Sequence, residues 1–366
     1  MKLVHCGKQS RVLRIDRLNS HRVLITPRNK SHTPPKRRTP TFDNGVIGEK
    51  RKKLRIAQIA AHPGTGRWRT MDSMPPVTPA NLIAALLTLI PYLAVAFFPQ
   101  ATARRVRTVP VALRLACPAA LVVPYILVAC AAGIFRAGWF ALYAAFPVGV
   151  ATILWQAARV DADQHGNWRD FLVLGALGLA VDLRWFEAAW PPDLAIFNKM
   201  ILLNAGIYGF VLIRQLSGTG FDLRLRFNDL GIGLREAAFY TPIALALGLS
   251  LHFLHLHPGW PAPGRAILAW IFTFFFIAVP EELFFRGWLQ NLLEKRIGRY
   301  GALFLTACLF GLAHFNKQTT SFNWRYVLLA AIAGVFYGRA WRQQQRVGAS
   351  AVTHATVDAI WSLWLR

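Results

Sequence analysis

The stretch AILAWIFTFFFIAVPEELFFRGWLQNLL, residues 266–293, decides the fold of this chain. At 1.5 Å per residue, a helix of this length crosses a hydrocarbon layer of roughly 30 Å. The stretch is almost entirely apolar, yet it holds Glu281, Glu282 and Arg286. A charged residue at the centre of a bilayer costs about 2.5–3.5 kcal/mol on insertion scales, so these acids need partners, protonation or water. The stretch therefore predicts a membrane helix with functional polar residues.

Further apolar segments occur on both sides of this stretch. They cover residues 82–98, 115–135, 138–157, 171–190, 196–213, 237–256, 301–315, 326–341 and 349–365. The fourth is interrupted by Asp182, Arg184 and Glu187, which we interpret as an interfacial charge cluster. The pattern predicts an all-α fold, a polytopic transmembrane helical bundle of about eight to ten helices.

The composition supports a lipid environment. Hydrophobic residues make up 54% of the chain and charged residues 16%, against about 25% charged in soluble domains. The net charge of +25 could indicate nucleic acid, but residues 1–74 hold 18 Lys and Arg against 4 Asp and Glu. The remaining surplus is typical of cytoplasmic loops. We therefore expect the lipid bilayer, and no nucleic acid, as a partner.

Three regions follow from this distribution. Residues 1–74 are basic, rich in Pro, Ser and Thr, and predicted to be disordered. Residues 75–264 are an N-terminal transmembrane region of unknown role, and residues 265–366 are the predicted catalytic helical core. A second hypothesis for the first region is that it is not translated and that the protein starts at Met71 or Met74.

The positive-inside rule supports that hypothesis. If the first helix starts outside, the cytoplasmic loops carry clusters of basic residues near 104–107, 159–169, 214–235, 295–299 and 339–346. The opposite loops carry only Arg136, Arg265, Lys317 and Arg325. Residues 1–74 would then lie on the outer face, which is the wrong side for so basic a stretch. We expect a multi-pass protein of the bacterial inner (plasma) membrane.

The acids of the deciding stretch have different surroundings. Glu282 and Arg286 are four residues apart and share a helix face, so they can pair. Glu281 points about 100° away and is the freer carboxylate. Pro280 lacks an N–H and clashes with the carbonyl of the residue four positions earlier, so the helix is expected to kink just before the acids and admit water.

Two later helices carry histidines, of which His314 matches the depth of Glu281. His354 lies 8 residues after Arg346, about 12 Å in, so helix tilt must absorb the difference. Phe310 and His314 are spaced i, i+4, as are His354 and Asp358, so that Asp358 can orient the His354 imidazole. Glu281 lies 14 residues before Lys295 and His314 lies 15 after Arg299, which puts both roughly 20 Å from the same basic loop. The side chains are therefore expected to converge.

Two chemistries suit such a site. A carboxylate and an imidazole can activate a water and direct it at a carbonyl, while the second imidazole stabilises the oxyanion. The same groups could bind a divalent metal such as Zn²⁺ through Glu281, His314 and His354. There is no His-Glu-x-x-His, Gly-x-Ser-x-Gly or Walker-type motif. His252, His255 and His257, spaced i, i+3, i+5, are interpreted as interfacial.

The series Glu-Glu-x-x-x-Arg, Phe-x-x-x-His and His-x-x-x-Asp resembles the CPBP family of CAAX-processing and bacteriocin-processing intramembrane proteases, over roughly residues 265 to 366. The resemblance implies that Glu281 is the water-activating base, supported by Glu282 and Arg286. It implies further that His314 shares the water and that His354 with Asp358 shapes the oxyanion site. The family is described both as metalloprotease and as glutamic protease, so the metal stays open. Asp358 stands where eukaryotic members have Asn.

The function implied is that of an intramembrane endopeptidase acting on a peptide or a lipid-anchored, including prenylated, protein. Two alternatives remain. The first is a non-proteolytic membrane scaffold or regulator of the same family. The second is a proton-coupled transporter, which is expected to show internal repeats that the sequence lacks.

Overall fold

The computed structural model describes residues 78–257, 259–317 and 321–365, and every regular element in these ranges is a helix. This confirms the predicted all-α class. The predicted disordered segment 1–74 and the proposed starts at Met71 and Met74 lie outside the described residues.

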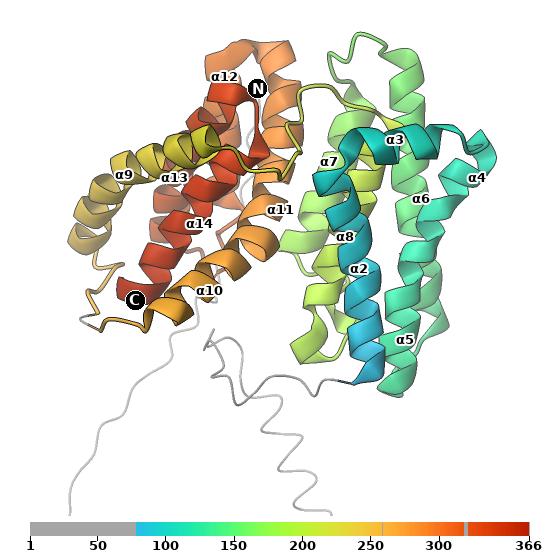
Figure 1. Ribbon diagram of the computed structural model, residues 1–366, viewed down its shortest axis with the longest axis horizontal. Helices are drawn as coiled ribbons and strands as arrows, with labels where there is room; N and C mark the ends of the chain where they lie inside the picture. Colours follow the sequence, from blue (N-terminus) through green and yellow to red (C-terminus); the bar gives the residue numbers. More distant parts are fainter. Residues whose placement is uncertain (1–77, 258, 318–320, 366) are drawn as a thin grey trace, which may run out of the picture. The chain divides into compact units, whose positions relative to one another are not determined.

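The first group of helices covers the N-terminal half of the described chain (Figure 1). It comprises α2 (Pro79–Phe97), α3 (Pro99–Arg107), α4 (Val111–Ala116), η2 (Cys117–Val122), α5 (Val123–Ala131), α6 (Ala137–Val160), α7 (Trp168–Asp182), η3 (Glu187–Ala189), η4 (Pro192–Leu194), α8 (Ile196–Ile207) and η5 (Tyr208–Ile213).

The second group carries the predicted site residues. It comprises α9 (Phe227–Ser250), α10 (Pro263–Thr273), η6 (Phe274–Ala278), α11 (Val279–Glu282), η7 (Leu283–Gln290), α12 (Asn291–Leu312), α13 (Trp324–Gln344) and α14 (Val347–Trp364). In Figure 1, α14 lies among α9, α10 and α13.

Six helical stretches in the described residues are long and apolar enough to cross a membrane. They are Pro79–Phe97, Val111–Ala131, Ala137–Val160, Pro192–Ile213, Phe227–Ser250 and Pro263–Leu312. The last stretch contains two predicted segments, and the chain turns between them at Gly298, whose φ is 74°. With these stretches, the prediction of a polytopic membrane protein is confirmed. The fourth predicted segment begins with α7, which at 15 residues is shorter than the roughly 20 needed to span alone.

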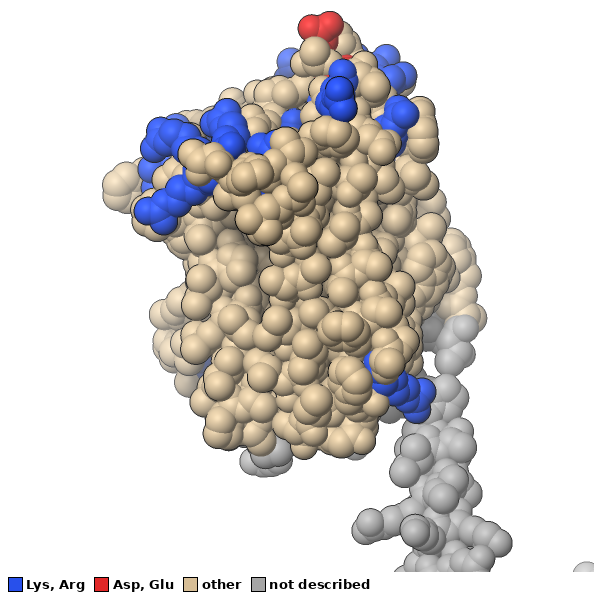
Figure 2. Space-filling model, turned by 90° about the vertical axis from the view of Figure 1, so that its right-hand side faces the viewer, with Lys and Arg blue, Asp and Glu red and all other residues tan. Residues whose placement is uncertain are grey.

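The predicted cytoplasmic loops meet at one end of the helices. Lys295 Nζ lies 3.3 Å from Ser217 Oγ, and Arg296 Nε donates to the carbonyl of Gly166 at 2.8 Å. Arg107 reaches the side chain of Gln215, 3.2 Å away. Figure 2 shows Lys and Arg gathered at the upper end of one face, above a broad uncharged surface with further basic side chains at its lower edge. The grouping of these loops on one side is therefore confirmed.

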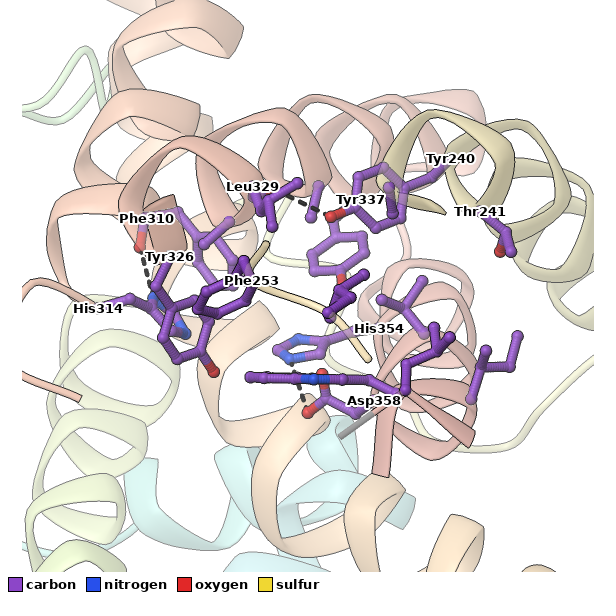
Figure 3. A pocket seen from close by; sticks show the side chains of 18 residues that line it. Tyr240, Thr241, Phe253, Phe310, His314, Tyr326, Leu329, Tyr337, His354 and Asp358 are labelled. Carbon is purple, nitrogen blue, oxygen red and sulfur yellow. Dashed lines mark hydrogen bonds and ion pairs between the residues drawn. The ribbon is translucent and has the colours of Figure 1, made fainter. Parts of the chain in front are cut away.

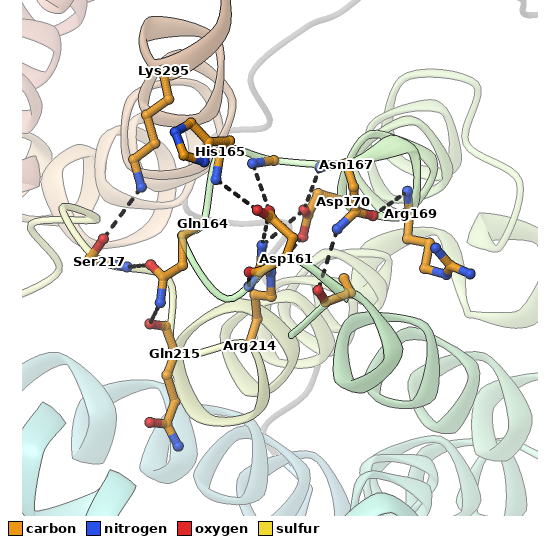
Figure 4. Close-up of polar contacts among 12 residues, drawn as sticks. Asp161, Gln164, His165, Asn167, Arg169, Asp170, Arg214, Gln215, Ser217 and Lys295 are labelled. Atoms are coloured by element: carbon orange, nitrogen blue, oxygen red, sulfur yellow. Dashed lines mark hydrogen bonds and ion pairs between the residues drawn. The ribbon is translucent and has the colours of Figure 1, made fainter. Parts of the chain in front are cut away.

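Arg214 is the centre of a buried charge network at this end (Figure 4). Its Nη2 lies 2.6 Å from Asp161 Oδ2, and its Nε lies 3.0 Å from Asp170 Oδ1. Partial burial raises the pKa of Asp161, but hydrogen bonds from the N–H groups of Gly166 and His165 together with Arg214 outweigh it and hold this pKa below its ordinary value. The network ties α6, α7 and η5 together.

Close helix packing depends on glycine at two positions that frame the site. A Cβ at Gly311 would lie 2.5 Å from the carbonyl oxygen of Val327, so α12 and α13 approach closely only because this residue is glycine. A Cβ at Gly206 would lie 2.6 Å from the indole of Trp288. Glycine there lets α8 contact η7, where Trp288 also stacks on Phe210 with ring centroids 4.9 Å apart.

Candidate active site

The two acids lie where the helix leaves regular α-geometry. The backbone is π-helical over η6, before Pro280, and again over η7, after Glu282. Proline removes one backbone donor, and π-helical turns commonly appear where the i to i−4 ladder is disturbed. The predicted disturbance before the acids therefore takes the form of π-helical turns.

Glu282 is fully buried, and one of its oxygens contacts both Arg286 and His354. Its Oε1 lies 3.1 Å from Arg286 Nη1 and 2.9 Å from His354 Nδ1. Arg286 is also fully buried, donates to the carbonyl of Gly334 at 2.9 Å, and lies over the ring of Phe310. The predicted pairing of Glu282 with Arg286 is confirmed, whereas the contact between Glu282 and His354 was not predicted.

His354 lies among three carboxylates. Its Nδ1 faces Glu282, and its Nε2 lies 3.5 Å from Asp358 Oδ2 and 3.9 Å from Glu281 Oε2. The ring stacks nearly parallel on Tyr337, with centroids 4.7 Å apart. Because a carboxylate only accepts hydrogen bonds, Nδ1 of His354 carries a hydrogen and donates a hydrogen bond to Glu282. Asp358 was expected to orient this imidazole, but Glu282 makes the shorter contact.

Glu281 makes longer contacts than Glu282 and is the freer of the two glutamates, as predicted. Its side chain is 28% exposed, and its Oε1 lies 3.7 Å from Nζ of Lys317. Its Oε2 has no hydrogen-bond partner within the part of the chain that the structure describes. From the sequence, Lys317 was identified only as a residue of an outer loop. Its position three residues after His314 was the one feature of the sequence that indicated a place near the site.

His314 is held by its own helix. Its Nδ1 lies 2.8 Å from the carbonyl oxygen of Phe310, to which it donates, so Nε2 is left as an acceptor. The Phe310 ring contacts both imidazoles, with centroid distances of 4.9 Å to His314 and 5.7 Å to His354. The predicted residues on α11, η7 and α14 contact one another directly, and His314 joins them across Phe310.

A pocket opens beside the two histidines (Figure 3). Its cavity is about 70 Å³, and His314, His354 and Asp358 form its polar wall. The remaining wall is aliphatic and aromatic, and its aromatic side chains include Tyr240 from α9, Phe253, Tyr326 and Tyr337 from α13, and Trp361 from α14. Residues before 265 therefore contribute to the site.

The described side chains do not fit a metal site. No group of three His, Cys, Asp or Glu residues among them has a geometry that could hold a metal ion, and this includes His252, His255 and His257. In the expected set, the Glu281 carboxylate faces the ammonium group of Lys317. We therefore derive no chemical step through a metal.

One comparison with known proteins gives a match in this part of the chain. Residues 263–360 match the family model described as type II CAAX prenyl endopeptidase Rce1-like, and this range contains Glu281, Glu282, Arg286, His314, His354 and Asp358. No curated protein and no solved structure matches the chain. Within this multi-pass membrane protein, the matched residues and their motif series are thus similar to the Rce1-like type II CAAX prenyl endopeptidases.

Proposed function

We propose that the chain is an intramembrane endopeptidase that uses Glu281 and His314 to activate a water for hydrolysis of a peptide bond. The observation that carries this proposal is the contrast between the two glutamates. The Glu282 side chain is fully buried and its Oε1 is hydrogen-bonded to Arg286 and His354, whereas the Glu281 side chain is 28% exposed and makes no hydrogen bond with the described residues. A general base needs such a free oxygen within reach of the water it deprotonates.

The reaction proceeds by addition and elimination. Glu281 takes a proton from the water while the water oxygen bonds to the carbonyl carbon, and the carbonyl electron pair moves onto its oxygen. His314 accepts a hydrogen bond from the same water through Nε2. When the tetrahedral intermediate collapses, the C–N bond breaks and Glu281 returns its proton to the leaving nitrogen. The products are a carboxylic acid and an amine.

His354 is suited to stabilise the oxyanion. Its Nε2 faces Asp358 and Glu281, and a proton on this nitrogen makes it a donor to developing negative charge. Glu282 and Arg286 act as positioning residues, because Glu282 holds the imidazole through Nδ1 and Arg286 holds Glu282. In this scheme residues 265–366 carry the chemistry.

The substrate class follows from the location of the site. The residues lie on helices of a membrane protein, so the scissile bond must belong to a protein or peptide held at the bilayer, and prenylated proteins meet this requirement. We place the protein in the bacterial inner membrane, with its basic loops on the cytoplasmic side.

The test is cleavage of a quenched fluorescent peptide library, with and without a prenyl group, by purified protein in detergent. Glu281→Gln and His314→Asn are compared with Glu187→Gln and His255→Asn, which change the same residue types in η3 and after the end of α9. We expect the first two variants to lose cleavage by several orders of magnitude and the two controls to keep it.

Two outcomes would contradict the proposal. Absence of cleavage from folded protein with every peptide would favour the scaffold or regulator alternative. Cleavage that persists in Glu281→Gln would show that another group activates the water. A response to the prenyl group would identify the substrate as lipid-anchored.

A further inference from the structure

Three tyrosine side chains line the pocket beside the histidines, and their hydroxyls differ. The Tyr240 hydroxyl donates to the carbonyl of Leu329 at 3.0 Å. The hydroxyls of Tyr326 and Tyr337 make no hydrogen bond within residues 78–257, 259–317 and 321–365. A phenolic hydroxyl that lines a cavity and has no acceptor in the protein is free to donate a hydrogen bond to a polar group that binds there.

Tyr337 is fixed firmly beside His354. It is 2% exposed, and its ring stacks on the imidazole at an interplanar angle of 16°. Its hydroxyl oxygen is not fully enclosed by protein atoms. The hydroxyl therefore faces the cavity that the residue lines. In Figure 3 this ring lies directly next to His354.

Tyr326 holds the corresponding position beside His314. Its ring centroid lies 4.9 Å from the imidazole of His314 and 5.0 Å from the ring of Trp361, to which it is nearly perpendicular. Its backbone N–H is capped by Asn323 at the start of α13. Figure 3 shows the Tyr326 ring between His314 and the α14 side of the pocket. Both tyrosines are thus held by packing before any substrate binds.

We propose that the hydroxyls of Tyr326 and Tyr337 donate hydrogen bonds to the carbonyl oxygen of the scissile peptide bond. Both are then catalytic residues of the proposed reaction, on which this inference rests. A substrate carbonyl is an acceptor, and an oxyanion is a stronger one, so it satisfies hydroxyls that have no acceptor in the free protein. Preorganised donors in a water-poor site stabilise the developing charge without reorganising.

The proposal explains why the pocket pairs each imidazole with a tyrosine. Addition of water transfers the carbonyl electron pair to oxygen, and two donors aimed into one cavity spread that charge. Tyr326 reaches from the His314 side, where the water is activated, and Tyr337 reaches from the His354 side. Neither residue belongs to the motif series that identified the family.

The experiment compares Tyr326→Phe and Tyr337→Phe with Tyr208→Phe, using the best fluorogenic peptide from the library. Each change removes one oxygen and keeps the ring. Tyr208→Phe is the matched control, because its hydroxyl donates to the carbonyl of Arg114 at 2.7 Å and the residue does not line this pocket. We expect kcat to fall about 100–1,000-fold for each of the first two variants, with little change in KM. The control should keep its kcat.

Inhibitor binding separates this role from packing. A peptide phosphonamidate carries the tetrahedral oxygens, whereas a reduced-amide peptide has no carbonyl oxygen. Tyr326→Phe and Tyr337→Phe should weaken binding of the phosphonamidate and leave binding of the reduced amide unchanged. Unchanged kcat in both variants, or equal losses for both inhibitors, would overturn the inference while leaving the protease function intact. A wild-type protein that cleaves no peptide would overturn both.

Discussion

His354 donates a hydrogen bond through Nδ1 to the buried carboxylate of Glu282, 2.9 Å away, although 72 residues separate them in the chain. Asp358, on the same helix as His354, lies farther from its ring, at 3.5 Å from Nε2. The shorter of the two contacts to the imidazole therefore comes from α11, and the longer one comes from α14, its own helix. The second glutamate of the motif thus contacts the candidate site through His354.

The two carboxylates should therefore differ in importance. We expect Glu282→Gln to lower kcat by about 10–100-fold, because a hydrogen bond to a charged group contributes about 1.5–3 kcal/mol. Asp358→Asn should cost less, since its contact is longer and its side chain is partly exposed. Steady-state kinetics on one peptide measures both. A larger loss for Asp358→Asn would show that Asp358 has a direct role that these distances do not capture.

The Glu282–Arg286 pair should also control stability. Both side chains are fully buried, so Arg286→Met leaves a carboxylate that keeps only its bond to His354. Removing one partner of a buried pair typically costs about 3–5 kcal/mol, whereas replacing both by apolar residues costs much less. Denaturant unfolding in detergent should show Glu282→Leu/Arg286→Met to be more stable than Arg286→Met alone. Additive losses would indicate that the two charges are independent.

The sequence predicted those parts of the site that depend on local spacing. Glu282 and Arg286 share a helix face at i, i+4, and the structure pairs them. The contacts of Lys317 with Glu281 and of His354 with Glu282 depend on how separate helices dock, which spacing along one helix does not encode. The uncommitted hydroxyls of Tyr326 and Tyr337 were missed for the same reason.

Helix limits were predicted well where apolar residues define them and less well where buried charges do. Helix α9 begins at Phe227, ten residues before the predicted segment 237–256. Its first turns bury Asp229 and Glu236, which hydropathy assigns to a loop. Arg346 pairs with Asp229 at 2.9 Å, and Arg339 pairs with Glu236 at 3.2 Å. These pairs allow the charged turns to be helical and buried.

The network around Arg214 predicts a dependence of stability on pH. The folded-state pKa of Asp161 lies below its ordinary value of 3.8, so the carboxylate stabilises the fold above that pH and loses this contribution as pH falls through the folded pKa. Arg214→Gln should be less stable than wild type at pH 7 by about 3–5 kcal/mol, because Asp170 is left buried without a cation. Thermal unfolding from pH 7 to pH 3 should show this difference narrowing below about pH 3.8. A stability difference that stays constant from pH 7 to pH 3 would show that the contribution of Asp161 does not depend on Arg214.

Chelation provides a direct test of the metal question. The reaction proposed above uses only side chains, and the described residues supply no three-ligand group. We therefore expect cleavage to survive dialysis against 1,10-phenanthroline or EDTA. Loss of activity that returns on adding Zn²⁺ would contradict this scheme and would make Glu281, His314 and His354 the ligands to test first.

The arrangement of basic loops predicts the orientation of the protein. The loops that contain Arg107, Arg214 and Lys295 meet at one end, and the positive-inside rule assigns that end to the cytoplasm. In a cysteine-free background, a cysteine replacing Arg136 should react with a membrane-impermeant maleimide on intact cells, whereas one replacing Arg299 should react only after lysis. Both residues are exposed, so burial does not explain the difference. The reverse labelling pattern would invert the topology. It would also invert the side on which Lys317 lies, and with it the face from which a substrate approaches Glu281.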